Sequence, residues 1–186
     1  YASSNGFISF NSGAANSATN NMTTPAASML PLIAPLWDDL DGATAGTASY
    51  STTGTAGSRV FTFQWSNWEW YYSANVAVIS FQVKLYEADG KIEFIYSPIA
   101  SPLNSPSASV GLVGTTVGNF LSLNSLGTNP TTSSTTETTS IAANPVNGQM
   151  YTFTRPTQAT SLAWSPMTDL YTDAAATSPY TGQNVN

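Results

Sequence analysis

Three aspartates lie within four residues in the stretch WDDLDG, at positions 38, 39 and 41. Carboxylates spaced this closely could act as the acid and base of a glycosidase, or they could bind a hard cation such as calcium. A glycosidase centred on Asp38 and Asp39 would need a second, separated acid, and none stands out. The EF-hand calcium pattern fails as well, because Trp37 and Ala48 would occupy its first and twelfth positions.

Two interpretations of this acidic stretch remain, a solvated turn and an irregular calcium site. Adjacent carboxylates repel one another unless a cation or N–H groups lie among them, and the chain has only four basic residues. Alternation along an extended segment sends Asp38 and Asp39 to opposite faces, so at most Asp39 and Asp41 converge. The sequence therefore predicts no cofactor other than calcium, with Asp39 and Asp41 as its candidate ligands.

Other kinds of chemistry find no support in the residue types. The chain has no histidine and no cysteine, which removes the Ser-His triad, the usual zinc ligands and any disulfide framework. No phosphate-binding or nucleophile-elbow motif occurs. The net charge is −6, and the basic residues are scattered, so we expect no nucleic-acid partner and no binding to an anionic membrane. Without a long apolar run, no membrane insertion is expected. We predict that the protein is not an enzyme.

Five aromatic residues fall within the stretch WSNWEWYY, residues 65–72. Trp65 continues the apolar face of Phe61 and Phe63 and is predicted to lie in the core. Trp68 and Trp70 have the opposite parity, so we expect a β-bulge or a strand end at the two residues after Trp65.

The aromatic residues after that point have two interpretations. They could cap the open end of a sandwich core, or they could form a stacking surface for a ligand or partner, since large exposed aromatics mark interfaces. The candidate surface comprises Trp68, Trp70, Tyr71 and Tyr72.

Period-two alternation of apolar and polar residues recurs along the chain, whereas helical periodicity is nearly absent. Short strands are predicted at residues 6–10, 48–51, 60–65, 76–86, 91–96, 108–113, 120–123 and 150–154. With the apolar segment 30–40, about nine strands in turn-rich surroundings predict an all-β fold, an antiparallel β-sandwich of the jelly-roll or Ig-like type. Pro31 and Pro35 cannot donate to a ladder, so segment 30–40 is expected to be an edge strand or an extended crossing.

The clearest local signal is the Asp89-Gly90 pair between two alternating runs, which predicts a two-residue type I′ hairpin. That turn would pair Leu85 with Phe94 and Val83 with Tyr96, and it would keep all four side chains on the apolar face.

The polar stretch 127–140 is predicted to be a long loop without core-forming residues. We expect one β-sandwich domain over residues 1–155. Residues 156–186 would be a linker and the truncated start of a second, Ig-like module. Because the chain opens within what looks like the approach to a strand, we expect it to be part of a longer protein.

Several stretches occur in an order that resembles a known family: SSNGFISF, PLIAPLWDDLD, RVFTFQW, ISFQVKLYEADGKIEFIYSP and ASVGLVG. They resemble the β-rich domain of large proteins that Bacteroidota export by the type IX secretion route. The match covers about residues 1–154, and the chain is more distantly similar to the NIDO adhesion domain. The tail WSPMTDLYTDAAATSPYTG resembles the start of the Ig-like repeats that follow such domains.

The resemblance implies an adhesin-like protein that is secreted or anchored at the bacterial cell surface. We expect a non-catalytic β-sandwich module that serves adhesion or surface-filament architecture. Its expected partners are neighbouring Ig-like modules of the same chain and other surface proteins or glycans. The alternative is a carbohydrate-binding module of a secreted polysaccharide-degrading enzyme, for which the aromatic surface would be the reason.

Overall fold

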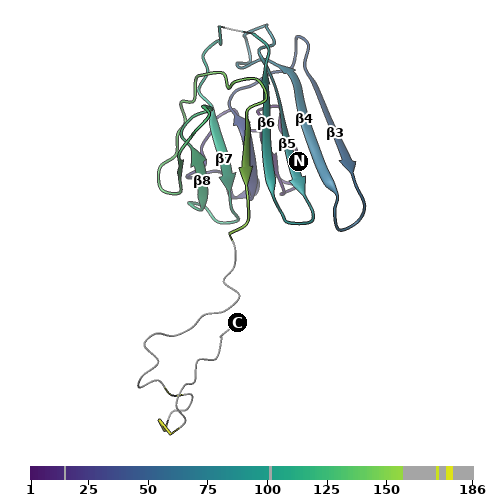
Figure 1. Ribbon diagram of the computed structural model, residues 1–186. Coiled ribbons are helices and arrows are strands. Elements are labelled where there is room, and N and C mark those ends of the chain that lie inside the picture. The colour runs from purple at the N-terminus through teal and green to yellow at the C-terminus, as the bar shows by residue number, and fades with distance from the viewer. Residues whose placement is uncertain (15, 101, 157–170, 172–174, 178–186) are drawn as a thin grey trace. The chain divides into compact units, whose positions relative to one another are not determined.

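The computed structural model describes residues 1–14, 16–100, 102–156, 171 and 175–177. The chain divides into two compact units, Tyr1–Thr154 and Arg155–Asn186. The first unit is all-β, and its two five-stranded antiparallel sheets pack as a sandwich (Figure 1). The predicted fold class is therefore confirmed. Most of the residues assigned to an Ig-like module lie outside the described part of the chain, so that assignment stays a prediction.

The first sheet has the strand order β1-β2-β7-β8-β9. Its strands are β1 (Ile8–Ser9), β2 (Leu32–Trp37), β7 (Ser109–Val113), β8 (Phe120–Leu123) and β9 (Thr132–Ser133). A single turn of 3-10 helix, Ala27–Met29, precedes β2. β9 lies inside residues 127–140, so the prediction that this whole stretch is a loop is wrong. Glu137 helps to hold this stretch, because its carboxylate accepts the backbone N–H groups of Met22 and Thr23.

The second sheet has the strand order β10-β6-β5-β4-β3, and Figure 1 shows β3 at its free edge. Its strands are β3 (Thr47–Thr53), β4 (Val60–Trp68), β5 (Ile79–Tyr86), β6 (Ile92–Pro98) and β10 (Met150–Phe153). The apolar residues of the alternating runs form the inner face of this sheet. There Trp65 stacks on Phe81 with ring centroids 4.7 Å apart. Ile33 and Val110 of the other sheet belong to the same buried cluster.

Strand β2 lies between β1 and β7, so the prediction of an edge strand or an extended crossing is wrong. The register with β7 shifts between Ala34, which pairs with Gly111, and Trp37, which pairs with Ser109. Pro35 falls in this irregularity. A bulge leaves a residue out of the ladder, and a proline without an N–H is tolerated there inside a sheet.

The hairpin between β5 and β6 has a different register from the predicted one. Leu85 pairs with Ile92 and Val83 with Phe94, because residues 87–90 form the loop. Within it, the N–H of Gly90 donates to the carbonyl of Tyr86. The two-residue I′ turn is therefore wrong. The shift is two residues, so the same side chains remain on the inner face. Gly90 has the positive φ, 69°, that the turn signal predicted.

Candidate functional site

The aromatic stretch 65–72 begins at the end of β4 and continues into the connection to β5. A register shift separates Trp65, which pairs with Phe81, from Trp68, which pairs with Ile79. The predicted bulge is confirmed, and Asn67 within it has a φ of 58°. The bulge reverses the parity of the strand, so that both tryptophans point into the sandwich.

All three tryptophans of this stretch are buried, Trp68 with 6% and Trp70 with 0% of its surface exposed. The indole N–H groups of the first two have backbone acceptors. Trp65 donates to the carbonyl of Ser3 and Trp68 to that of Ser4, both at 2.9 Å. The stacking surface is therefore wrong for Trp68 and Trp70. They cap the core, as the other interpretation held, because each indole finds an internal acceptor that makes burial cheap.

The loop between residues 42 and 46 packs directly on Trp68. A side chain at Gly42 would approach the ring of Trp68 to 2.7 Å, and one at Gly46 would approach it to 2.9 Å. The two glycines thus let the backbone cover the indole.

Tyr71 and Tyr72 remain at the surface, and 56% of Tyr72 is exposed. Their ring centroids lie 4.7 Å apart with the planes tilted by 55°. The pKa of Tyr71 is raised, first by a hydrogen bond with Tyr72, then by the charge of Tyr72, by burial and by the nearby Asp39. Val76 is also exposed. Tyr71 and Tyr72 are the part of the predicted surface that solvent can reach, and Val76 adds an exposed apolar side chain that was not predicted.

The loop that carries the two tyrosines is held by Glu69, which is buried. Its carboxylate accepts the backbone N–H of Thr44 at 3.0 Å. Burial raises the pKa of Glu69, but the hydrogen bonds from Thr44, Asn75 and Val76 lower it more, so the carboxylate stays ionised with a lowered pKa. Sequence reasoning missed this residue. The sequence feature that could have pointed to Glu69 is that it is the single charged residue within the aromatic stretch 65–72.

Asp38 of the acidic stretch is also buried, and it makes structural bonds. Its carboxylate accepts the indole N–H of Trp70 at 2.8 Å. It also accepts the backbone N–H of Ser107 at 2.6 Å and the hydroxyl of Ser107 at 2.9 Å. Although basic residues are few, neutral N–H and O–H donors take the place of cations around Asp38.

Asp41 and Asp39 lie on either side of Leu40 and are half-buried. Asp41 accepts the N–H groups of Gly42 and Ala43 at 2.7 and 3.0 Å, which closes a local turn. The pKa of Asp39 is raised by burial and by the charges of Asp38 and Asp41. Among the described residues, no three acidic side chains are grouped to hold a metal. The calcium site at Asp39 and Asp41 stays a prediction, which thermal unfolding with calcium and then with chelator tests.

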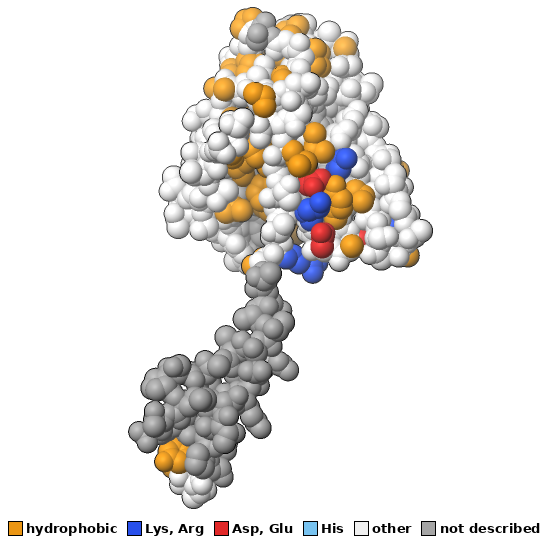
Figure 2. Space-filling view, in the orientation of Figure 1, with side chains coloured by type: hydrophobic (Ala, Val, Ile, Leu, Met, Phe, Trp, Pro, Cys, Tyr) orange, Lys and Arg blue, Asp and Glu red, His pale blue; other side chains and the backbone are white. Residues whose placement is uncertain are grey.

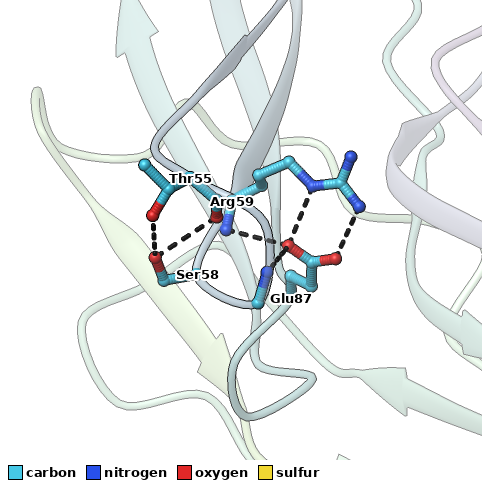
Figure 3. A network of polar contacts seen from close by, with 5 residues as sticks. Thr55, Ser58, Arg59 and Glu87 are labelled. Atoms are coloured by element: carbon cyan, nitrogen blue, oxygen red, sulfur yellow. Dashed lines mark hydrogen bonds and ion pairs between the residues drawn. The ribbon is translucent and has the colours of Figure 1, made fainter.

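Charged side chains of both signs lie side by side on the face drawn in Figure 2, and most of that face is uncharged. Lys91, just before β6, forms an ion pair at 2.8 Å with Glu93 of β6. Figure 3 shows a second pair, in which the carboxylate of Glu87 accepts the Nε–H of Arg59 at 2.9 Å. The same carboxylate accepts the backbone N–H of Gly57 at 2.9 Å. These contacts tie the β3–β4 turn to the β5–β6 loop. The charges have internal partners and do not form a surface of one sign.

The fold and this site define a β-sandwich module whose open end is capped by buried tryptophans. The NIDO-related family matches residues 1–155, and the chain belongs to this family. A NIDO-related β-sandwich indicates a non-catalytic module of a typically extracellular type. The comparison with curated proteins found no match, and neither did the comparison with solved structures. No helix among the described residues is long and apolar enough to cross a membrane.

Proposed function

We propose that the protein is a β-sandwich module of a large secreted or cell-surface bacterial protein, and that it serves adhesion or surface-filament architecture. The observation that carries this proposal is membership of the NIDO-related family over residues 1–155. The resemblance to exported proteins of Bacteroidota and the uncharged, hydroxyl-rich composition support the surface location. Its partners would be other surface proteins or glycans and neighbouring Ig-like modules.

The contact surface that we assign to adhesion is the loop with Tyr71, Tyr72 and Val76. The exposed ring of Tyr72 and the half-buried ring of Tyr71 are in contact, and together they offer a rigid area at small entropic cost, as in many recognition surfaces. The start of the loop is held in place, because the buried carboxylate of Glu69 accepts the backbone N–H of Thr44 and the N–H of Glu69 donates to the carbonyl of Asp41. Its end is held where the N–H of Val78 donates to the carbonyl of Trp68. A partner would therefore meet a surface that is already ordered, which lowers the entropic cost of binding.

Binding of the purified chain to an array of defined glycans and to a panel of purified extracellular-matrix proteins tests this proposal. We expect saturable binding that the double variant Tyr71→Ala/Tyr72→Ala loses. Phe10→Ala, which removes an exposed aromatic residue outside this loop, should leave binding intact. Binding that survives the tyrosine substitutions would refute this surface, and a chain that binds no probe would count against adhesion.

The same surface supports a second candidate, a carbohydrate-binding module of a secreted polysaccharide-degrading enzyme. Burial of Trp68 and Trp70 removes half of the aromatic set that suggested it. The pair Tyr71–Tyr72 remains, and tyrosine rings stack on sugars through their apolar faces. Strong selectivity for one polysaccharide class on the array would favour this candidate, whereas binding to matrix proteins alone would exclude it.

A further inference from the structure

Strand β3 is an open edge of the second sheet. Within the described residues it pairs with β4 alone, and all seven residues of Thr47–Thr53 are exposed. Alternate residues of a strand direct their N–H and C=O groups to opposite sides, so part of this backbone faces solvent instead of β4. A row of such groups is a template on which another strand can pair.

The other edges of the sandwich are much shorter than β3. β1 and β9 have two residues each, and β10 has four. Proteins usually protect a long edge with a charge, a proline or a bulge. β3 has none of these, because its sequence TASYSTT is uncharged and its register with β4 runs without a shift from Thr47 to Thr53. A long, regular and uncharged edge is the kind that pairs with another strand.

The sequence of β3 is nearly the same when read in either direction from Tyr50. An antiparallel pair related by a two-fold axis at Tyr50 would place Ser49 against Ser51 of the second copy. The same pairing would bring Thr47 against Thr53 and Ala48 against Thr52. Like residues would thus meet at nearly every position. The chain carries a net charge of −6, but this seam has no charge that would repel a second copy.

Tyr50 supplies the apolar contact at the centre of such a pair. It is 75% exposed, and its ring lies 6.2 Å from that of Phe61 on β4. Across a two-fold axis, the ring of the second copy would lie beside it and reduce the exposure of both. Aromatic pairs directly opposite each other are among the stabilising cross-strand pairs of antiparallel sheets.

We propose that two copies of this chain pair through β3, antiparallel and centred on Tyr50, so that the five-stranded sheets of both copies become one continuous sheet. This interface is a different surface from the Tyr71–Tyr72 loop and does not depend on the proposed adhesion. Two-fold pairing of identical surfaces is the commonest way in which soluble proteins form dimers. For a surface module, it would present two binding loops to a partner.

Sedimentation of the full chain over a range of concentrations, without any ligand, tests the pairing. We expect a monomer–dimer equilibrium. The double variant Ser49→Lys/Ser51→Lys places two like-charged pairs across the axis and should weaken dimerisation about tenfold. The matched variant Ser49→Lys/Ser51→Glu places opposite charges there and should dimerise at least as well as the wild type.

Any of three sedimentation results would overturn the proposal: a chain that stays monomeric, a dimer that both variants leave unchanged, or a dimer that both variants weaken equally. Unchanged circular dichroism of the variants would show that their folds are intact.

Cysteine trapping tests the register, and the chain is suited to it because it has no cysteine of its own. Opposed residues of an antiparallel pair have Cα atoms about 4.5 or 5.5 Å apart. Both spacings allow a disulfide, which needs about 4.4–6.8 Å. Ser49→Cys/Ser51→Cys, which keeps Tyr50 and places each cysteine opposite one of the second copy, should therefore form a covalent dimer under mild oxidation, whereas Thr53→Cys and Tyr72→Cys should stay largely monomeric. Equal trapping in all three variants, or none in Ser49→Cys/Ser51→Cys, would refute the two-fold pairing.

Discussion

The two ends of the sandwich hold their carboxylates in different ways. At the tryptophan end, Asp38 and Glu69 are buried and accept neutral indole, hydroxyl and backbone donors. At the hairpin end, Glu87 is in contact with solvent and is paired with Arg59. A hydrogen bond to a buried carboxylate replaces water that cannot return, so losing it costs the desolvation of the charge. At the exposed end, water can replace a lost hydrogen bond to the carboxylate, so the same number of bonds contributes less to the free energy of unfolding.

The largest loss of stability against unfolding is expected from Trp70→Ala. This change empties the space of a fully buried indole and removes a donor from buried Asp38. Large-to-small aromatic substitutions in cores cost about 3–5 kcal/mol. Urea unfolding should show that loss, and Tyr72→Ala on the exposed side of the same stretch should change stability by less than about 0.5 kcal/mol. Similar losses for both variants would mean that the two ends of this stretch are not divided into core and surface.

A smaller loss of stability against unfolding is expected from Gly90→Val, at the hairpin end. Gly90 has a φ of 69°, which a β-branched residue adopts only with strain. We expect a loss of about 1–2 kcal/mol, the usual cost of a disfavoured backbone conformation. The matched change Ala88→Val in the same loop should have little effect. A melting temperature that does not move in Gly90→Val would show that the loop can relax without positive φ.

The smallest effect is expected from the exposed ion pair. Hydrogen bonds from the side chain and backbone of Arg59 lower the pKa of Glu87 to about 2 from its ordinary value of 4.5. Because the folded pKa is the lower one, the pair stabilises the protein above pH 4.5 and loses that contribution as the pH falls towards 2. Glu87→Gln should therefore make unfolding less dependent on pH in this window. Identical profiles for variant and wild type would show that the pair contributes nothing.

Residues near the acidic stretch show why part of the site could be predicted. The change in parity after Trp65 predicted a bulge or a strand end there, and the structure has the bulge. The partners of Asp38 could not be found in the same way. Trp70 and Ser107 are far away along the chain, and only the packing of the two sheets brings them to one carboxylate.

Alternation along the sequence determined the fold class and the inner faces of the strands, because a period of two is a local property of an extended chain. It placed Trp65 in the core, while the Asp89-Gly90 pair placed Gly90 in a turn, where its φ is positive. The family motifs covered the same part of the chain as the NIDO-related match. Only the tertiary structure decided the hairpin register, which depends on the loop of residues 87–90. It also decided that Pro35 lies inside a sheet and that Trp68 and Trp70 are buried. The position of Pro35 and the burial of the tryptophans depend on contacts between distant segments, which supply the register shift between β2 and β7 and the acceptors of the indole N–H groups.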